Sequence, residues 1–344
     1  MPHDDTLPKI ITLSRRELVL GSVAFGAAAT LTLGAPDVAA KAPMARSQAS
    51  YWYRFPVGKF QATIISDGPL ALGKPGDTMK GMTEAETSKL LTDNFLSPDS
   101  IVLEQNILVL NTGSRLVMFD SGMGFSKMFG ATTGRMLTSL REAGFRPEQI
   151  DDIICTHAHI DHIGGLSTVR GNRIFRNATI HMPQSDYDFW TDQTKLTDKA
   201  LGAFVKHARA NLVPYQGRIK WVADGKEVLP GIQAMAAPGH TVGHTIFLIE
   251  SEKARLAFTG DTSHHQILLT ERPKTEFAFD GDPKLAVQSR LKVFDMLSKD
   301  KIPLLAFHFP WPGTGNLAKQ GDGYRFYPTP MTIVPIPPPA PKKA

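Results

Sequence analysis

Short apolar runs bounded by turn-forming residues predict strands through the middle of the chain. Residues 60–66 (FQATIIS) alternate between apolar and polar positions, which is typical of a strand. Residues 107–110 and 116–119 are apolar runs joined by Asn-Thr-Gly-Ser, which predicts a hairpin. A buried strand is expected at 150–155. Three more strands are expected at 245–250 and 254–259, which form a second hairpin, and at 304–307.

Apolar residues at helical spacing separate several of these strands. Thr83, with Glu86 three residues later, forms a capping box, which predicts the start of a helix. The apolar face of that helix would contain Leu90, Leu91 and Phe95. Further helices are predicted over 133–143, ending at Gly144, and over 283–297. Hairpins and strand–helix units in one chain predict mixed sheets covered by helices, which is a layered α/β (α+β) domain.

The first forty residues predict an export signal. Residues 14–20 (SRRELVL) form a twin-arginine pattern, and no charged residue occurs over 18–36. Small residues at 38–40 (VAA) match a signal-peptidase site, so cleavage is expected after Ala40. An uncleaved membrane anchor is the alternative, but the apolar run is slightly shorter than the roughly 20 residues of a spanning helix. We therefore expect a periplasmic or secreted protein without stable membrane insertion.

Two boundaries are expected in this chain of 344 residues. Residues 41–330 contain the predicted strands and helices and show no internal repeat, so they would form one domain. Residues 331–344 contain five prolines and two lysines. Because proline interrupts helices and central strands, this segment is expected to be an extended tail.

The composition excludes some classes of protein. With 42% hydrophobic and 21% charged residues, the chain is expected to fold. Its one cysteine, Cys155, excludes an intramolecular disulfide framework and is expected to pack in an apolar strand. The net charge is +5, and loss of residues 1–40, with three basic and four acidic side chains, makes it +6. This small excess, without a lysine cluster, does not indicate a nucleic-acid partner.

Four potential metal ligands lie within six residues directly after the strand predicted at 150–155. In the segment THAHIDHIGG they are His157, His159, Asp161 and His162. The first two are two positions apart, so in an extended segment their side chains point the same way. A catalytic zinc site needs three protein ligands and an open position. Four candidates here, with more downstream, therefore predict two metal ions.

Three further candidate ligands lie in the second half of the chain. His240 is part of a Pro-Gly-His-Thr-Val-Gly-His segment, and Asp261 and His308 each come just after a predicted strand. Functional side chains are common in loops that a rigid scaffold positions. Neutral imidazoles and carboxylates suit zinc, and they also bind manganese, iron or cobalt.

Together these segments resemble the metallo-β-lactamase superfamily. The resemblance is carried by the HxHxDH segment, the Gly-His-Thr-x-Gly-His segment, the Gly-Asp pair after a strand and the late histidine. The sequence is most similar to the branch of methyl parathion hydrolase and secreted lactonase-like enzymes, on the segments 67–68 (DG), 111–117 (NTGSRLV), 120–122 (DSG), 147–150 (PEQI), 188–194 (DFWTDQT) and 323–326 (GYRF). The resemblance implies an αββα sandwich, in which two mixed sheets lie between helical layers and the metals lie at one sheet edge.

The resemblance assigns seven side chains to two divalent metal ions, of which zinc is the expected one. The first ion would be bound by His157, His159 and His240, the second by Asp161, His162 and His308, and both by Asp261. No cysteine lies near Asp261 in the sequence, which disfavours the lactamase subclasses that use a cysteine ligand there.

A chemical mechanism follows from two neighbouring ions. A water that bridges them would lose a proton, and the resulting hydroxide would attack a carbonyl or phosphoryl centre. The resemblance thus predicts a hydrolase of small esters: lactones, aryl esters or phosphotriesters. Its expected catalytic residues are Asp161, Asp261 and His264. A β-lactamase and a glyoxalase-type thioester hydrolase are the alternatives, while the complete second ligand set argues against a mononuclear iron dioxygenase and a non-catalytic metal-binding protein.

Other residues are expected to surround the metals. Asp120 and His244 would orient metal ligands from behind. Phe129 and Trp190 match pocket aromatics of the methyl parathion hydrolase branch. His264 would also face the pocket. It departs from that branch, in which an apolar residue is expected at this position, and this puts a preference for organophosphates in doubt.

Some properties carry no readable signal. The loops 72–82 and 266–279 would shape the pocket, but nothing in them names a substrate. The role of His265 is open, whereas His181 and His207 are expected to be structural. The expected partner is a small-molecule substrate and not a nucleic acid, and a homodimer is possible.

Overall fold

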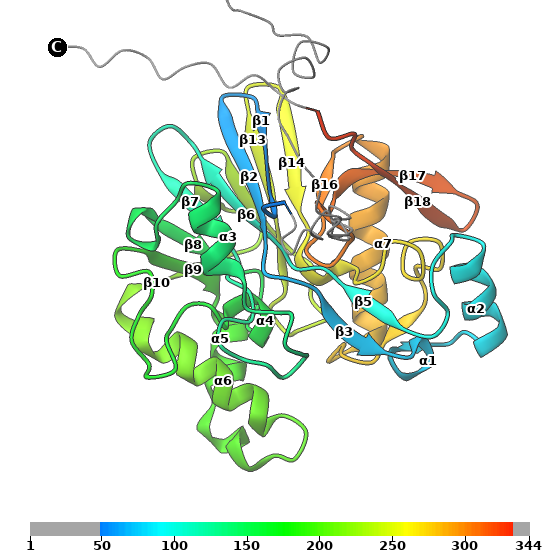
Figure 1. Ribbon diagram of the computed structural model, residues 1–344, viewed down its shortest axis with the longest axis horizontal. Coiled ribbons are helices and arrows are strands. Elements are labelled where there is room, and N and C mark those ends of the chain that lie inside the picture. The colour runs from blue at the N-terminus through cyan, green and yellow to red at the C-terminus, as the bar shows by residue number, and fades with distance from the viewer. Residues whose placement is uncertain (1–48, 333–344) are drawn as a thin grey trace, which may run out of the picture. The chain divides into compact units, whose positions relative to one another are not determined.

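Two seven-stranded β-sheets form the centre of the computed structural model, which describes residues 49–332 (Figure 1). The first sheet contains, in spatial order, β1 (Trp52–Val57), β2 (Phe60–Ser66), β6 (Asn106–Asn111), β7 (Leu116–Phe119), β8 (Asp152–Ile154), β9 (Thr179–Pro183) and β10 (Ile219–Val222). Neighbouring strands are antiparallel from β1 to β7 and parallel from β7 to β10, so the sheet is mixed.

The second sheet is also mixed. In spatial order it contains β11 (Glu227–Leu229), β12 (Ile232–Ala236), β13 (Thr245–Ser251), β14 (Ala254–Phe258), β16 (Leu304–Leu305), β17 (Thr314–Gln320) and β18 (Gly323–Pro328). Here β14 and β16 are parallel, and the other neighbours are antiparallel. Two small sheets pair β3 (Leu70–Gly73) with β5 (Ile101–Leu103) and β4 (Met79–Lys80) with β15 (Glu276–Phe277).

Helices cover the sheets from outside. The α-helices are α1 (Pro75–Thr78), α2 (Glu84–Thr92), α3 (Met136–Glu142), α4 (Ile160–Ile163), α5 (Gln184–Thr191), α6 (Gly202–Leu212) and α7 (Pro283–Lys299). The 3₁₀ turns are η1 (Pro147–Gln149), η2 (Gln193–Thr197), η3 (Val213–Arg218) and η4 (Gly260–Thr262). Helix α3 packs on β1 and β2, α5 packs on β9, and α7 packs on β17, so each sheet has helices on its outer side (Figure 1).

Apolar side chains from both sheets fill the space between them. Phe119 on β7 contacts Phe247 on β13 and Phe258 on β14, with ring centroids 5.9 and 5.3 Å apart. All three rings are fully buried, and such burial is the main favourable term in folding. Two packed mixed sheets with helices outside confirm the predicted αββα sandwich.

The predicted hairpins are present, because β6 pairs with β7 and β13 pairs with β14, both antiparallel. The strand predicted at 60–66 is also confirmed, but its last five residues are all buried instead of alternating. One face of this strand packs on α3 and the other faces the core between the sheets. The predicted strands at 150–155 and 304–307 are shorter in the structure, as β8 and β16.

Helix α2 begins at the predicted capping box. The hydroxyl of Thr83 accepts the backbone N–H of Glu86, and the carboxylate of Glu86 accepts the backbone N–H of Thr83. The prediction that Phe95 contributes to the apolar face of this helix is wrong. The helix ends at Thr92, and Phe95 is 98% exposed in the left-handed backbone region, with φ of 59°.

Helix α3 begins at Met136 and not at Thr133, as the sequence pattern predicted. The buried carboxylate of Asp67 accepts the backbone N–H groups of Met136 and Gly134. Because Gly134 has a φ of 83°, the chain turns there and cannot be helical. A long-range contact therefore sets the start of this helix. Its end agrees with the prediction, since Gly144 follows with a φ of 91°.

The sheet topology brings several strand ends to one edge of the sandwich. Strands β7 and β8 are parallel, so Asp120 and His157 leave the first sheet side by side. Strands β14 and β16 are also parallel, so Asp261 and His308 leave the second sheet side by side. Polar residues far apart in the sequence are thereby gathered in loops at this edge.

Residues 1–48 and 333–344 lie outside the described part of the chain. The predicted signal at 1–40, with its cleavage site, and nearly all of the predicted tail at 331–344 fall there. Over residues 49–332, no helix combines the length and the apolar character that crossing a membrane requires.

Asp152→Asn is expected to destabilise the fold, and most strongly at neutral pH. Asp152 on β8 is buried, accepts a hydrogen bond from His181 at 2.8 Å, and pairs with Arg115. Burial alone would raise the pKa of this carboxyl, but the hydrogen bonds from His181 and Arg115 lower it below its usual value. The charge therefore stabilises the fold fully above the unfolded-state pKa of about 4. This contribution is lost as the pH falls through the lower folded-state pKa.

Urea unfolding of the metal-free protein tests this prediction. Wild type and Asp152→Asn should differ by about 1–3 kcal/mol in free energy of unfolding at neutral pH. The difference should shrink as the pH falls below about 4 and through the lowered folded-state pKa of the wild-type carboxyl. A difference independent of pH would mean that the charge of Asp152 contributes nothing.

Candidate metal centre

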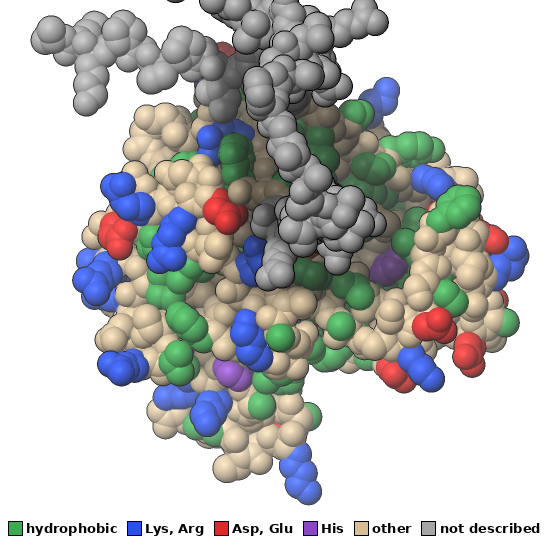
Figure 2. All heavy atoms as spheres, viewed as in Figure 1, with side chains coloured by type: hydrophobic (Ala, Val, Ile, Leu, Met, Phe, Trp, Pro, Cys, Tyr) green, Lys and Arg blue, Asp and Glu red, His purple; other side chains and the backbone are tan. Residues whose placement is uncertain are grey.

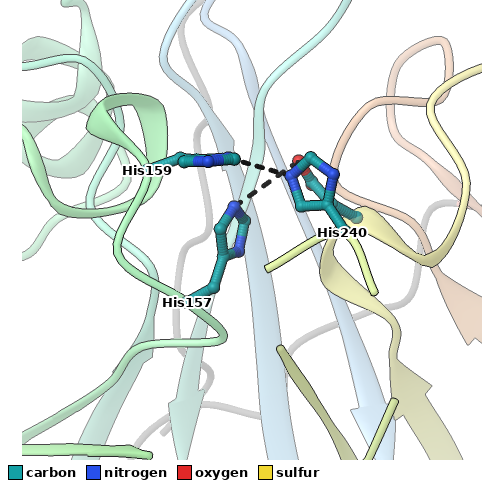
Figure 3. Close-up of side chains that lie close together, drawn as sticks. His157, His159 and His240 are labelled. Carbon is teal, nitrogen blue, oxygen red and sulfur yellow. Dashed lines mark hydrogen bonds and ion pairs between the residues drawn. The ribbon is translucent and has the colours of Figure 1, made fainter. Parts of the chain in front are cut away.

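The segment after β8 carries four of the predicted ligands. His157 and His159 lie in the loop that joins β8 to α4, and His159 is the N-cap of that helix. Asp161 and His162 follow on α4 itself. The rings of His157 and His159 lie 4.7 Å apart between centroids, and Figure 3 shows both pointing toward His240 on a neighbouring loop.

Three other loops bring the remaining ligands. His240 follows β12, Asp261 lies in η4 after β14, and His308 follows β16. Because β12, β13 and β14 are successive antiparallel strands, the ends of β12 and β14 lie at the same edge of the sheet. All three side chains are buried. The structure thus gathers all seven predicted residues in one place, from four segments of the chain.

Asp261 lies between two groups of side chains. The first group also contains His157, His159 and His240, and the second also contains Asp161, His162 and His308. Within each group the candidate ligand atoms lie within 4.8 Å of one another. Oδ2 of Asp261 is 3.2 Å from Nε2 of His240, and Oδ1 is 3.2 Å from Nε2 of His162. This carboxylate can therefore contribute to both groups.

Several buried polar atoms at the centre lack a hydrogen-bond partner. Within residues 49–332, Nε2 of His157, Nε2 of His162 and Oδ1 of Asp261 are buried without a hydrogen-bond partner. Burying polar atoms unpaired costs free energy, and a bound cation would remove that cost. The donors are imidazole nitrogens and carboxylate oxygens, which suit Zn²⁺. The residues present therefore fit two divalent metal ions.

Asp120 and Thr156 orient two of the histidines from behind. The carboxylate of Asp120 accepts hydrogen bonds from Nδ1 of His162 at 2.8 Å and from the hydroxyl of Thr156 at 2.9 Å. Because that hydroxyl donates to Asp120, its oxygen accepts the Nδ1 proton of His157 at 3.0 Å. With each Nδ1 engaged in this way, both rings point their Nε2 atoms toward the centre. Asp120 was a sequence candidate, whereas Thr156 was missed although it directly precedes His157.

Two other rings are oriented by segments distant in sequence. Nδ1 of His240 donates to Oδ1 of Asp280 at 2.9 Å, and Nδ1 of His308 donates to the carbonyl of Glu104 at 2.9 Å. Neither Asp280 nor Glu104 was predicted. The residues after Asp280, Gly-Asp-Pro, indicate only the start of α7, so no local signal could have revealed its contact with His240.

His244 acts on the backbone and not on a ligand ring. Its Nδ1 donates to the carbonyl of Ala237 at 3.0 Å, and its Nε2 accepts the backbone N–H of Asp261 at 2.9 Å. The side chain is fully buried. His244 thus holds the turn that presents Asp261, which is a more indirect role than the sequence suggested.

Burial and neighbouring charges set the protonation states in the metal-free protein. Burial lowers the pKa of His157 and of His159 well below the usual value, so both rings are neutral at pH 7, as metal ligands must be. Burial also opposes protonation of His240 and His308, but interactions with Asp261 prevail and raise the pKa of each to about 9. Burial likewise opposes protonation of His162, but Asp261, Asp161 and Asp120 raise its pKa well above the usual value. Metal binding at these three rings must therefore displace protons.

A cavity of about 260 Å³ adjoins the two groups. Five of the seven candidate ligands line it: His159, Asp161, His240, Asp261 and His308. Most of the other lining residues are apolar, and both predicted pocket aromatics, Phe129 and Trp190, are among them. A concave apolar site with a few convergent polar groups is typical of small-molecule binding.

The two adjacent histidines after Asp261 have different environments. His264 lines the cavity, its Nε2 is 3.0 Å from Oδ2 of Asp261, and its ring stacks on Phe277 with centroids 3.9 Å apart. His265 turns away, and its Nδ1 accepts two backbone N–H groups at 3.1 Å from the turn that follows. The structure therefore places His264 at the pocket and makes His265 structural.

Other polar side chains lie apart from the two groups. His181 and His207 belong to neither group, and His181 bonds to Asp152 on a neighbouring strand. On the face of the molecule in Figure 2, lysine and arginine side chains are scattered among apolar and acidic ones and form no continuous patch.

Asp280→Ala is expected to weaken metal binding in the first group by about 10- to 100-fold, the usual cost of losing a residue that orients a metal ligand. Without the carboxylate, Nδ1 of His240 loses its acceptor and the ring is free to rotate. Competition with a chromophoric zinc chelator measures the affinity. Asp282→Ala is the matched control, because Asp282 only caps α7 and should leave zinc affinity unchanged. Equal affinities in both variants would refute the role of Asp280.

Comparison with known families gives one clear match. Residues 101–308 match the model of the metallo-beta-lactamase superfamily, and this range includes all seven candidate ligands. An N-acyl homoserine lactonase from Bacillus cereus is 29% identical over 175 residues, which cover 51% of this chain and 59% of that enzyme. The chain thus matches little more than half the length of this curated relative.

Solved structures resemble the chain over a greater length. AidC, a dizinc quorum-quenching lactonase in complex with a product, is 29% identical with a TM-score of 0.77, and the match covers 83% of this chain and 99% of that one. AbOPH, a hydrolase in the beta lactamase superfamily, is 27% identical with a TM-score of 0.78, over 83% of this chain and 100% of that one. The finer resemblance to the methyl parathion hydrolase branch stays a prediction.

Proposed function

The chain belongs to the metallo-β-lactamase superfamily, and from this premise we propose that it is a dinuclear metal-dependent hydrolase of lactones. The observation that carries the proposal is the pair of His/Asp groups that share Asp261 beside an apolar cavity. Zinc is the proposed metal, because the donors suit it and AidC is a dizinc enzyme. N-acyl homoserine lactones are the first substrates to test, since the similar Bacillus cereus enzyme is a lactonase of that class.

In the proposed reaction the metal ions activate the substrate and the water, and the protein side chains orient the ligands and accept a proton. When bound, two divalent ions polarise the ester carbonyl and make a water more acidic. Asp120, Thr156 and Asp280 keep the ligand rings in fixed orientations. The carboxylate of Asp161 lines the cavity and is available to accept a proton from the attacking water. No serine or cysteine nucleophile is required.

The apolar lining of the cavity favours a substrate with an apolar part. Phe129, Trp190, Phe204 and Phe279 belong to its wall, whereas the polar groups are those of the candidate metal centre and its neighbours. An acyl chain would displace water from this wall, and burying apolar area favours binding. The ester carbonyl would then lie beside the metal groups. Aryl esters, phosphotriesters and β-lactams present electrophiles of similar size, so they are the competing substrates.

A hydrolysis panel on zinc-loaded protein tests the proposal. The panel contains N-acyl homoserine lactones, simple lactones, aryl esters, phosphotriesters and β-lactams, each assayed also with the Asp261→Ala variant. We expect kcat/KM for a lactone to exceed that for the other classes by about 100-fold, a difference of about 2.7 kcal/mol in transition-state binding. Faster turnover of another class, or equal activity of the variant, would reject the proposal.

A further inference from the structure

Asn106 bridges the two sheets next to the candidate metal centre. It lies at the start of β6 in the first sheet and is fully buried. Its side-chain amide nitrogen lies 2.7 Å from the carbonyl of Phe309, 3.1 Å from that of Phe307 and 3.2 Å from that of Ala306. These carbonyls belong to the loop after β16 in the second sheet. The two N–H groups of this amide therefore contact three carbonyls, at positions 306, 307 and 309, in a loop about 200 residues away in the chain.

The loop held in this way carries His308, one of the candidate ligands. The carbonyls bonded to the side chain of Asn106 lie on both sides of His308 in the sequence. The backbone N–H of Asn106 also donates to the carbonyl of Phe307 at 2.8 Å. Two residues before Asn106, the carbonyl of Glu104 accepts the Nδ1 proton of His308 at 2.9 Å. The segment 104–106 thus holds both the backbone and the ring of this histidine.

The sheet ladder alone does not hold His308. Strand β16 ends at Leu305, and the chain rejoins the sheet only at Thr314. Between these two strands the loop depends on other hydrogen bonds. An asparagine side chain can supply them, because its amide nitrogen carries two N–H donors. The loop approaches Asn106 so closely that only glycine fits at position 313. A Cβ added to Gly313 would lie 2.4 Å from the amide nitrogen of Asn106.

The orientation of the amide is fixed by its surroundings. The oxygen Oδ1 of Asn106 is buried and has no hydrogen-bond partner in the part of the chain that the structure describes. The nitrogen faces three carbonyl oxygens, so exchanging the two atoms would place oxygen against oxygen. The unpaired oxygen costs free energy, and the hydrogen bonds made by the nitrogen offset that cost.

We propose that Asn106 is a positioning residue for the second metal group and acts through His308. The inference rests on the proposed function, in which the group of Asp161, His162, Asp261 and His308 binds a metal ion. Nε2 of His308 lies 3.2 Å from Oδ2 of Asp161 and 3.4 Å from Oδ2 of Asp261. A shift of the loop would change these distances, whereas the ligands of the first group other than Asp261 come from segments that Asn106 does not bond.

A purely structural role makes a different prediction. If Asn106 only joined the two sheets, its removal would lower stability without distinguishing one metal group from the other. If Asn106 positions His308, its removal weakens the second group selectively. The affinity of each group for zinc therefore separates the two roles, and this measurement does not depend on any substrate.

The test is a zinc titration of Asn106→Ala against a chromophoric chelator, which gives the stoichiometry and two dissociation constants. We expect one of the two binding steps to lose about 10- to 100-fold in affinity while the other keeps its wild-type value. The affected step should be the same one that His308→Ala removes. Cobalt absorption spectra of the same variant should show one unchanged and one perturbed centre. If Asn106→Ala does not fold, Asn106→Ser, which retains a single donor, is titrated in its place and should show a smaller selective loss.

Asn211→Ala is the matched control. Asn211 is also buried, and its amide bonds to the backbone of Ser167 and His207, neither of which is a candidate ligand. This variant should lose stability and keep both zinc affinities. Unchanged affinities in the Asn106 variant, or an equal loss at both groups, would overturn the inference. A wild-type protein that binds fewer than two zinc ions would instead refute the proposed function, so the two failures are distinguishable.

Discussion

Asp261→Ala should reduce hydrolysis by at least about 10⁴-fold, which corresponds to about 5.5 kcal/mol of transition-state stabilisation. The size of the effect follows from its position. Asp261 is the one residue common to both metal groups, and its carboxylate oxygens lie 3.2 Å from His240 of one group and 3.2 Å from His162 of the other. Without it, each group keeps only three ligands, and nothing fixes the distance between two ions.

Removal of Asp261 also changes the charge of the centre. Burial by itself would raise the pKa of this carboxyl, but His162, His308 and His264 lower it well below its usual value, so it is ionised. Its negative charge therefore offsets part of the repulsion between two divalent cations. We expect the variant to bind fewer than two zinc ions per chain, which elemental analysis after dialysis measures.

The matched control for Asp261→Ala is Asp152→Asn. Asp152 is an equally buried carboxylate with a histidine partner, but it lies on β8 outside both metal groups. This variant should lose stability and retain two zinc ions and most of its turnover. An Asp261 variant with two tightly bound zinc ions and near wild-type activity would show that the bridging assignment is wrong.

His308→Ala should lose zinc and turnover together, with kcat/KM reduced by about 10³-fold. The second group then retains Asp161, His162 and Asp261, and no imidazole remains from the loop after β16. The first group keeps all of its ligands, so one zinc ion should stay bound. The prediction requires both quantities to fall together. It is tested by measuring zinc content and kcat/KM on the same preparation.

His181→Ala is the control for this variant. His181 is buried like His308 and also bonds to a partner through one ring nitrogen, but that partner is Asp152 and not a metal ligand. It should become less stable and keep both zinc ions. Full activity of His308→Ala would mean that the second metal group is assigned incorrectly.

Local sequence patterns were sufficient for much of the fold and of the candidate centre. Four of the seven candidate ligands are concentrated within six residues after a predicted strand, a density that is rare without a metal. The capping box at Thr83 and the two hairpins depend on neighbouring residues alone, so they were predicted correctly. The superfamily could be recognised because its motifs are short and contiguous.

Predictions failed where a distant contact decides the local conformation. The start of α3 is set by Asp67, which lies almost seventy residues earlier in the chain, and a periodic apolar pattern contains no trace of it. Phe95 was assigned to a helix face because apolar spacing continued, although the helix ended first. Asp280 contacts His240 across forty residues, and Asn106 contacts the loop that carries His308 across about two hundred. Nothing beside either residue in the sequence indicates these contacts.

The sequence by itself determined which residues have the chemistry for a metal centre, because imidazole and carboxylate side chains follow strands in a recognisable order. It also determined the layered α/β class, because strand and helix periodicities are local. The resemblance already implied that both ions share Asp261, but only the tertiary structure gave the distances that place its carboxylate between the two groups. Only the tertiary structure also revealed that Thr156, Asp280 and Glu104 orient ligand rings. Those relations depend on distances between four loops, and parallel pairing of β7 with β8 and of β14 with β16 sets these distances.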